Sequence, residues 1–265
     1  MLAGLAAATA PAPSGQATVW AVGDGANGST ASKAVAAMVT RGHPDRFLYL
    51  GDVYPNGSAA DFRRAYDPVY GRLAARTAPT PGNHEWGQRA QGYFPYWKRK
   101  LGHDLAPWYA SDLAGWQILS LNSEAPHGRG SPQLRWLSRR LATPGTCRLA
   151  YWHRPRFSAG RVHGDAPDTA PLWNALVGHA ALVLNGHEHD LQRFAPRNGL
   201  VEIVAGAGGN GHYALNPRPR GLAFGDATRY GAARIELQPG RAHVSLIARG
   251  GKQLDATDVS CTPLG

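Results

Sequence analysis

The sequence predicts a layered α/β fold, and three observations support this prediction. Short apolar segments recur along the chain, and most are followed by a polar, glycine-rich loop. Helical patterns lie between several of these segments, as expected when strands alternate with helices. Near the C-terminus, two apolar segments are separated only by residues 238–241, Gln-Pro-Gly-Arg, which is typical of a hairpin turn. The later part of the sheet structure is therefore expected to be mixed or antiparallel.

Each expected element follows from its own pattern. The expected strands are the apolar runs at residues 18–22, 46–50, 117–121, 148–152, 181–184, 201–205, 233–237 and 242–248. The expected helices are the alanine-rich residues 30–40, a segment that starts at residue 131, and residues 171–179. In the second of these, Ser131 and Pro132 provide an N-cap and a first-turn proline. Leu134, Leu137 and Leu141 then follow at helical spacing.

Composition limits the class of protein. A chain of 265 residues fits one α/β domain or two small ones, and 43% apolar residues exclude disorder caused by low hydrophobicity. No apolar run reaches the roughly 18 residues that a membrane-spanning helix needs. The formal net charge of +10 favours anionic ligands such as phosphoesters or nucleic acid. No dense run of lysine and arginine accompanies this charge, so a dedicated nucleic-acid module is a weaker alternative.

The N-terminus and the two cysteines indicate an oxidising compartment. Residues 1–15 are small and apolar with Ala-x-Ala-like steps, and we expect a signal-peptide remnant or a flexible leader outside the fold. Cys147 and Cys261 lie in no CxxC motif and near no histidine at zinc spacing, which argues against a thiolate metal site. A disulfide between them is expected, with two unpaired buried thiols as the alternative. The predicted location is secreted or extracytoplasmic.

Polar side chains follow the expected strands in a regular way. They are Asp24 and Asp52, each after a glycine, the Gly-Asn-His-Glu segment at 82–85, His153, and the Gly-His-Glu-His segment at 186–189. In open α/β sheets, ligands bind beyond the carboxyl ends of the strands, so we expect these side chains to converge on one crevice. Any one segment alone is also compatible with a turn, a helix cap or a structural histidine. Five such segments in this order indicate a metal site.

The donor types suit hard or borderline metal ions. Carboxylate, amide oxygen and imidazole occur without sulfur. Two ions a few ångströms apart need about seven protein ligands, one of them a bridging carboxylate. Such a pair polarises a phosphoryl oxygen and generates hydroxide near neutral pH. The glycines before the ligands allow the backbone to turn sharply and approach closely.

This order of motifs resembles the calcineurin-like metallophosphoesterase superfamily over roughly residues 18–247. Ala26 stands where many members have a histidine, which is similar to the purple acid phosphatase branch. The resemblance implies a four-layer α/β/β/α sandwich of two mixed β-sheets flanked by helices, with the metal site at the loop edge. It implies one metallophosphoesterase domain over residues 16–265 and two metal ions. Fe, Zn or Mn suit these ligands best, and Ca or Mg are also compatible.

The resemblance also implies a role for each site residue. The first metal would be held by Asp24, Asp52, His189 and a tyrosine, and the second by Asn83, His153, His187 and the bridging Asp52. The family places the tyrosine three residues after the second aspartate, where this chain has Pro55. Tyr54, two residues after Asp52, is the predicted ligand. Because its spacing is shifted by one residue, two alternatives stay open for the metals: the ferric–phenolate centre of this branch, or two ordinary divalent ions. His84 would contact the phosphate and help to protonate the leaving group.

Three further residues are candidates for substrate binding. Arg154 and Arg156 flank the expected ligand His153, and either guanidinium could hold a phosphate oxygen; two solvated loop arginines are the alternative. His163 lies in the same loop. Residues 206–211 match GxGxxG after a strand, but the following sequence cannot form a helix, so this segment is expected to be a loop beside the metal cleft and not a dinucleotide site.

The predicted function is metal-dependent hydrolysis of phosphoesters, and first of all phosphomonoesters, by a metal-activated hydroxide at a binuclear centre. The partner would be a small phosphorylated substrate. A phosphodiesterase or nuclease with the same metal site is one alternative, and the positive charge favours it. A non-catalytic protein that binds phosphate or metal is the other. The sequence has no G-x-S-x-G elbow that would indicate a serine nucleophile.

Overall fold

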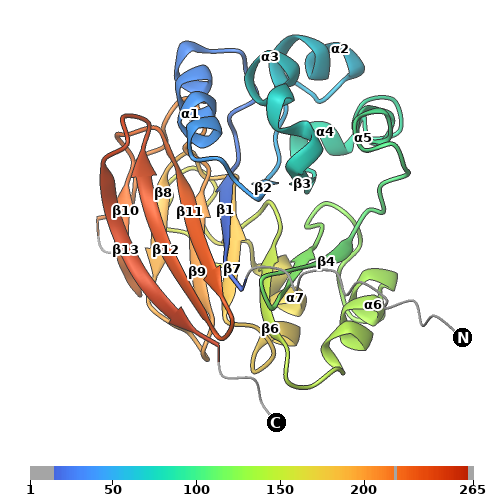
Figure 1. The fold of residues 1–265 in the computed structure, drawn as a ribbon, viewed down its shortest axis with the longest axis vertical. Coiled ribbons are helices and arrows are strands. Elements are labelled where there is room, and N and C mark those ends of the chain that lie inside the picture. Colours follow the sequence, from blue (N-terminus) through green and yellow to red (C-terminus); the bar gives the residue numbers. More distant parts are fainter. Residues whose placement is uncertain (1–14, 218–219, 262–265) are drawn as a thin grey trace, which may run out of the picture.

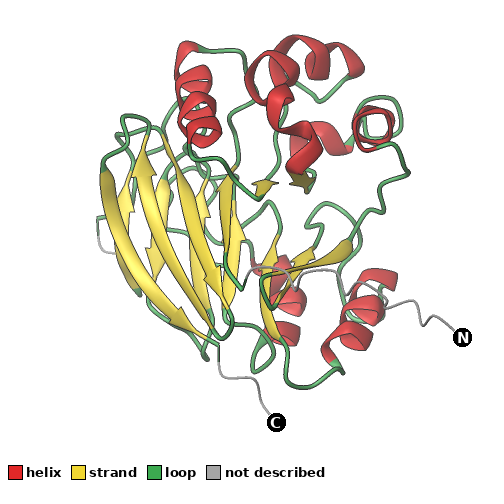
Figure 2. Cartoon of the chain, viewed as in Figure 1, coloured by secondary structure: helices red, strands yellow, loops and turns green. Residues whose placement is uncertain are grey.

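The computed structural model describes residues 15–217 and 220–261. The leader predicted at residues 1–15 therefore lies almost entirely outside the described residues. Two β-sheets pack face to face, and helices cover their outer faces (Figures 1 and 2). This confirms the predicted four-layer α/β/β/α sandwich of two mixed sheets.

The first sheet has six strands in the order β13-β12-β11-β1-β2-β3. The strands are β1 (Ala17–Val22), β2 (Arg46–Tyr49), β3 (Thr77–Pro79), β11 (Gly231–Gln238), β12 (Arg241–Ala248) and β13 (Gln253–Ser260). β1, β2 and β3 run parallel, whereas β11, β12 and β13 are antiparallel. Gln238 pairs with Arg241, which confirms the predicted hairpin.

The second sheet has seven strands in the order β10-β8-β9-β7-β6-β5-β4. The strands are β4 (Tyr109–Leu113), β5 (Trp116–Ser120), β6 (Cys147–Tyr151), β7 (Leu182–Asn185), β8 (Leu191–Phe194), β9 (Val201–Ala205) and β10 (Leu222–Asp226). β5, β6, β7 and β9 are parallel and form its centre. Parallel strands end at the same edge of a sheet, so the loops that follow them lie together.

Helices cover the outer face of each sheet. The helical segments are α1 (Thr30–Arg41), α2 (Ala59–Asp61), η1 (Phe62–Tyr66), α3 (Asp67–Tyr70), η2 (Gly71–Arg76), α4 (Asn83–Trp86), α5 (Tyr93–Leu101), α6 (Pro132–Leu141), η3 (Pro167–Thr169) and α7 (Ala170–Leu176). Apolar residues of α1, η1, α3 and α5 pack on the first sheet, and those of α6 and α7 pack on the second. The predicted N-cap of α6 is confirmed, because the Ser131 hydroxyl accepts the N–H of Leu134 at 3.1 Å.

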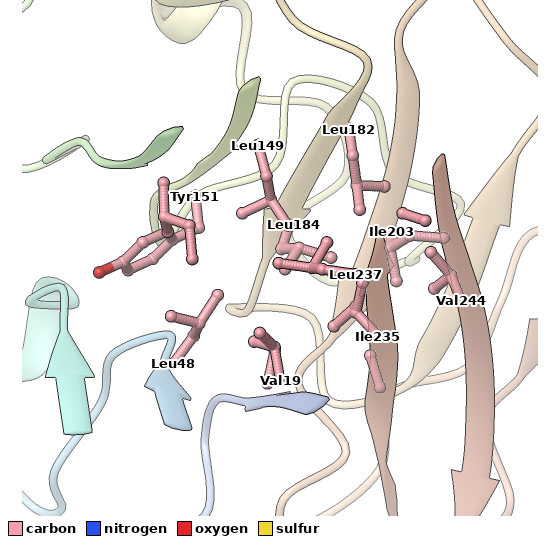
Figure 3. Close-up of a cluster of buried hydrophobic side chains, with 14 of the residues drawn as sticks. Val19, Leu48, Leu149, Tyr151, Leu182, Leu184, Ile203, Ile235, Leu237 and Val244 are labelled. Carbon is pink, nitrogen blue, oxygen red and sulfur yellow. The ribbon is translucent and has the colours of Figure 1, made fainter. Parts of the chain in front are cut away.

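The main core lies between the two sheets (Figure 3). Val19 and Leu48 from the first sheet face Leu149, Leu182 and other branched side chains from the second. All four of these side chains are completely buried. Close packing of this layer holds the two sheets together, and with them the two groups of loops at their edges.

A disulfide also joins the sheets. Cys147 at the start of β6 is bonded to Cys261, which follows β13, and their Cα atoms are 5.6 Å apart. This confirms the predicted pairing. Among residues 15–217 and 220–261, no helix combines the length and apolar character needed to cross a membrane.

Candidate metal centre

The polar segments predicted to converge do so at one edge of the sandwich. Asp24 follows β1 and Asp52 follows β2, both in the first sheet. His153 follows β6 and the segment 186–189 follows β7, both in the second sheet. Asn83 begins α4, which lies shortly after β3. Each segment therefore stands at the carboxyl end of a parallel strand, where the chain of an α/β protein leaves its sheet.

Asp52 lies at the middle of this group, and its two oxygens face two different sets of donors. Oδ1 is 3.3 Å from Nε2 of His153. Oδ2 is 3.3 Å from the hydroxyl of Tyr54. The carboxylate is buried, with only 2% of the residue exposed. A carboxylate in this position can bind two cations at once, one through each oxygen.

The first set of donors consists of Asp24, Tyr54 and His189. The Tyr54 hydroxyl is 3.0 Å from Nε2 of His189 and 3.3 Å from Oδ1 of Asp24. Nε2 of His189 is in turn 3.6 Å from the same Asp24 oxygen. The shifted spacing of Tyr54 in the sequence therefore does not keep its phenol away from the cluster.

The second set consists of Asn83, His153 and His187. Nε2 of His153 is 3.0 Å from Oδ1 of Asn83 and 3.1 Å from Nδ1 of His187. Together with Asp52, the two histidines offer ligand atoms that all lie within 4.8 Å of one another. Nitrogen and oxygen atoms at this separation can reach a single cation between them.

Hydrogen bonds from the backbone aim these side chains inward. Nδ1 of His153 is 2.8 Å from the Leu50 carbonyl, and Nδ1 of His189 is 2.6 Å from the Gly211 carbonyl. Each bond leaves Nε2 free to point into the cluster, as is usual for metal-binding histidines. The main-chain N–H of His187 donates to Oδ2 of Asp24 at 2.7 Å.

Glu85 holds the main chain at Asp52 by hydrogen bonds, a role that the sequence did not reveal. Its side chain is fully buried and accepts the main-chain N–H groups of Asp52 at 3.1 Å and Val53 at 3.0 Å. Burial raises the pKa of this carboxyl to about 7, and the nearby Asp52 adds to the effect. The position of Glu85 in the Gly-Asn-His-Glu segment was the available signal, but the segment alone does not reveal which groups the carboxylate contacts.

The backbone at the cluster is strained. Asp24, Asp52 and His187 have φ values of 59°, 70° and 72°, in the left-handed region that residues other than glycine rarely adopt. Gly82 is needed for a different reason. A Cβ atom there would lie 2.1 Å from Oδ1 of Asp52, so only glycine permits this close approach.

The protonation properties of the cluster reflect the crowding of buried charges. Burial raises the pKa of Asp24 well above its ordinary value. Burial would likewise raise the pKa of Asp52, but the adjacent His153 lowers it below the usual range. For His153, burial opposes the charged form, yet the Asp52 carboxylate raises its pKa to about 10. Burial and the positive charge of His153 lower the pKa of His187 to about 2, so His187 is uncharged near neutral pH.

These residues fit two metal ions. Hard oxygen and borderline nitrogen donors converge in two sets that share Asp52, and no sulfur takes part. Without metal, protons offset the charge of the two buried carboxylates, because the pKa values of Asp24 and His153 are both raised. Bound cations would offset the same charge in place of these protons, so the donor chemistry and the buried carboxylates both fit a binuclear centre.

Two predicted substrate-binding histidines lie at the edge of the cluster. Nε2 of His84 is 3.7 Å from Oδ2 of Asp52, while its Nδ1 is 2.5 Å from the Pro55 carbonyl. The His84 side chain is 35% exposed and can be reached from solvent. The ring of His163 stacks on that of His187 with centroids 4.1 Å apart. Both imidazoles therefore adjoin the donor atoms without belonging to either set.

The two predicted arginines point elsewhere. The guanidinium of Arg154 donates to Glu124 at 3.0 Å and to Asp168 at 2.6 Å and 3.1 Å. In this arrangement it is already paired with carboxylates. The guanidinium of Arg156 lies over the ring of Phe157, 4.5 Å from the centroid. Neither guanidinium contacts the metal donors within the described residues.

A tyrosine that our sequence analysis missed does adjoin the cluster. Tyr213 lies in the loop after β9, and its ring stacks on His189 with centroids 3.9 Å apart. The same loop contains residues 206–211, which form no helix and reach the centre through the Gly211 carbonyl. The prediction of a loop beside the metal cleft is confirmed. Tyr213 itself gave no signal, because neither a motif nor regular spacing marks it.

A four-layer sandwich with carboxylate, amide and imidazole donors at the ends of parallel strands defines a metallophosphoesterase. The chain belongs to the calcineurin-like phosphoesterase family, whose sequence model matches residues 18–191. This confirms the resemblance deduced from the motifs. A comparison with curated protein sequences found no significant match.

Solved structures with this fold have very different sequences. Purple acid phosphatase PPD1 from yellow lupin seeds superimposes with a TM-score of 0.75 at 15% identity, over 94% of this chain. The present chain spans only 55% of the lupin protein. GAP50, the anchor in the inner membrane complex of Plasmodium, superimposes with a TM-score of 0.76 at 12% identity. The match covers 93% of this chain and 89% of GAP50. A dimetal phosphatase from Danio rerio superimposes with a TM-score of 0.62 at 15% identity. The match covers 92% of this chain and 99% of the Danio rerio protein. At such identities the likeness establishes the fold alone.

Proposed function

We propose that this protein is a binuclear metallophosphoesterase that hydrolyses phosphomonoesters, with residues 16–265 acting as one catalytic domain. The observation that carries the proposal is the arrangement around Asp52, whose two oxygens face two separate donor sets. Asp24, Tyr54 and His189 would hold one metal ion together with Asp52. Asn83, His153 and His187 would hold the other. Fe, Zn or Mn best suit this mixture of oxygen and nitrogen donors.

Bound metal ions would supply Lewis-acid polarisation of the phosphoryl oxygens and a water of lowered pKa. The protein's own groups would do the rest. The buried Asp52 and Asp24 carboxylates stay fixed by main-chain N–H donors, so the centre needs little reorganisation during the reaction. His84, at the exposed edge of the centre, would donate a proton to the leaving oxygen. His163 would contact the phosphate from the neighbouring loop.

Two other functions remain as alternatives. The net charge of +10 favours a phosphodiesterase or nuclease with the same donors. The likeness to GAP50, described as an anchor, favours a non-catalytic binding protein. Against the second alternative, every predicted donor type is present at the cluster, and none has been replaced by an apolar residue.

A direct test combines metal analysis with two substrates. We expect two metal ions per loaded chain by elemental analysis. We also expect faster hydrolysis of p-nitrophenyl phosphate than of bis-p-nitrophenyl phosphate. The opposite ratio, with strong inhibition by salt, would favour the phosphodiesterase. Metal binding without turnover of either ester would favour the binding protein.

The same proposal includes an extracytoplasmic location. The disulfide between Cys147 and Cys261 supports it, because such bonds persist mainly in oxidising compartments. Finding the two thiols reduced in protein isolated from its natural source would contradict this location.

A further inference from the structure

Two loops are joined beside the candidate metal centre. One follows β6 and the other follows β9. The N–H of Arg161 in the first donates to the Ala214 carbonyl in the second at 2.9 Å, and the N–H of Asn216 donates back to the Ala159 carbonyl at 2.7 Å. This pair of bonds resembles a short antiparallel ladder and fixes the two loops relative to each other.

The joined loops are also attached to the metal-binding segment itself. Glu188 stands between His187 and His189 and is fully buried. One of its oxygens accepts the N–H groups of His163 at 3.2 Å and Gly164 at 2.6 Å. The loop after β6 is therefore attached by hydrogen bonds to Glu188, the residue between the two histidines.

This attachment places an aromatic ring on each of the two histidines. Tyr213 stacks on His189 with centroids 3.9 Å apart and an angle of 17° between the rings. His163 stacks on His187 with centroids 4.1 Å apart and an angle of 29°. The two outer rings meet edge to face at 5.3 Å. Tyr213 and His163 thus form one continuous aromatic surface over both donor sets.

The hydroxyl of Tyr213 has no assigned role in this arrangement. It makes no hydrogen bond among residues 15–217 and 220–261, although the residue is half-buried. An ordinary tyrosine phenol is protonated at neutral pH and can donate a hydrogen bond.

We propose that Tyr213 contacts the substrate, its hydroxyl donating a hydrogen bond to an oxygen of the phosphoryl group. The inference rests on the proposed function and adds a contact that neither the motifs nor the donor sets contain. The stacked ring has little rotational freedom, so little entropy is lost when the hydrogen bond forms. A donor fixed in this way next to a charged phosphoryl oxygen forms one of the stronger kinds of hydrogen bond.

Tyr213→Phe tests this contact because it removes the hydroxyl and keeps the ring that packs on His189. Tyr230→Phe is the matched control. Tyr230 stacks in a similar way on His212, with centroids 4.1 Å apart and an angle of 27°, but His212 belongs to neither donor set. Each variant therefore loses a hydroxyl from a tyrosine that stacks on a histidine, but only Tyr213 stacks on a histidine of a donor set.

Two measurements on metal-loaded protein give the result. One is the Kd of inorganic phosphate by calorimetry, and the other is kcat/KM for p-nitrophenyl phosphate. For Tyr213→Phe we expect a Kd about tenfold higher and a kcat/KM about tenfold lower, as for the loss of one hydrogen bond to a charged group. The metal content should equal that of the wild type. Tyr230→Phe should stay within about twofold of the wild type in both measurements.

The outcomes separate the contact from the proposed function. If the wild type binds phosphate and turns over the ester, but Tyr213→Phe equals it in both measurements, the contact is absent and the function stands. If the wild type binds phosphate without turnover and Tyr213→Phe binds it more weakly, the contact stands and the function is wrong. A loaded wild type that neither binds phosphate nor hydrolyses the ester would overturn both.

Discussion

The hydroxyl of Tyr54 lies 3.0 Å from Nε2 of His189, although 135 positions separate the two residues in the chain. Tyr54 follows β2 of the first sheet, and His189 follows β7 of the second. The contact therefore depends on the packing of one sheet against the other. It also brings a phenol into a donor set that otherwise contains one carboxylate and one imidazole.

Tyr54→Phe tests whether this phenol binds metal. Burial raises the pKa of Tyr54, and the Asp24 and Asp52 carboxylates raise it further, so only a bound cation would deprotonate it near neutral pH. Protein loaded with ferric iron should then show a visible phenolate-to-iron absorption band, and Tyr54→Phe should lack it. Tyr213→Phe should keep the band. A band of equal strength in Tyr54→Phe would exclude Tyr54 as a ligand.

Glu85→Gln tests how far the centre depends on the hydrogen bonds between Glu85 and the main chain of Asp52 and Val53. An amide oxygen can replace only one of the two carboxylate oxygens that accept N–H groups from Asp52 and Val53. We expect metal affinity and kcat/KM to fall by about 10- to 100-fold, as for other groups that orient a metal ligand. Glu236→Gln is the control, because its side chain on β11 is 43% exposed and pairs with Arg234 on the same strand. Wild-type affinity and activity in Glu85→Gln would show that the support is dispensable.

Glu202 predicts a pH dependence of stability that is independent of the metal donors. Burial raises its pKa from 4.5 to about 8, despite hydrogen bonds from the N–H groups of Arg156 and Phe157. The folded state therefore binds this proton more tightly than the unfolded state between these two values. The contribution of Glu202 to the free energy of unfolding should accordingly fall as pH rises through that window.

Urea unfolding of metal-free protein at pH 5 and pH 8 measures this contribution. Between these pH values, the wild type should lose on the order of a few kcal/mol more stability than Glu202→Gln, which cannot titrate there. The comparison uses the change with pH, so a uniform loss of stability in the variant does not affect it. Parallel pH dependences in the two proteins would show that Glu202 has an ordinary pKa.

The disulfide should contribute to stability as well as indicate location. It closes a loop with a sequence separation of 114 and ties β6 to the end of β13. Replacing Cys147 and Cys261 together by alanine should lower the free energy of unfolding by about 2–5 kcal/mol. Reducing the wild type should give a similar loss and should not affect the double variant. A double variant as stable as the oxidised wild type would contradict this contribution.

Much of the fold could be predicted because its central strands are apolar and end in polar loops. The segments that became β1, β2, β6, β7 and β9 were each expected within one or two residues of their observed bounds. Other strands lacked this pattern. β3 has only three residues, and β13 is half-exposed with two aspartates, Asp255 and Asp258, so neither resembles a buried strand.

The helices between residues 59 and 101 were also missed, although a usable signal exists. Phe62, Tyr66 and Tyr70 recur every four residues and lie on one buried face. Aromatic residues at this spacing indicate a helix as well as aliphatic ones do. The next helix, α5, likewise places Tyr93 and Trp97 in the core.

At the site, the sequence could predict which polar side chains converge, but not the groups that hold them in place. Asp24, Asp52 and the histidines stand in short motifs at strand ends, where chemistry and topology point in the same direction. Glu85 and Tyr213 adjoin the cluster through contacts made only after the chain folds. The pairing of Arg154 with the carboxylates of Glu124 and Asp168 also forms only in the folded chain. Spacing along the chain does not contain this information.

The central claim is that a metal pair centred on Asp52 hydrolyses phosphomonoesters. The most direct test is the turnover of p-nitrophenyl phosphate by metal-loaded wild type, by the same protein after chelation, and by Asp52→Asn with its metal content measured. We expect chelation to abolish turnover, metal to restore it, and Asp52→Asn to lose more than about 100-fold in kcat/KM, since even indirect supports of a metal site contribute 10- to 100-fold. Turnover that survives both chelation and the loss of the Asp52 carboxylate would contradict the claim.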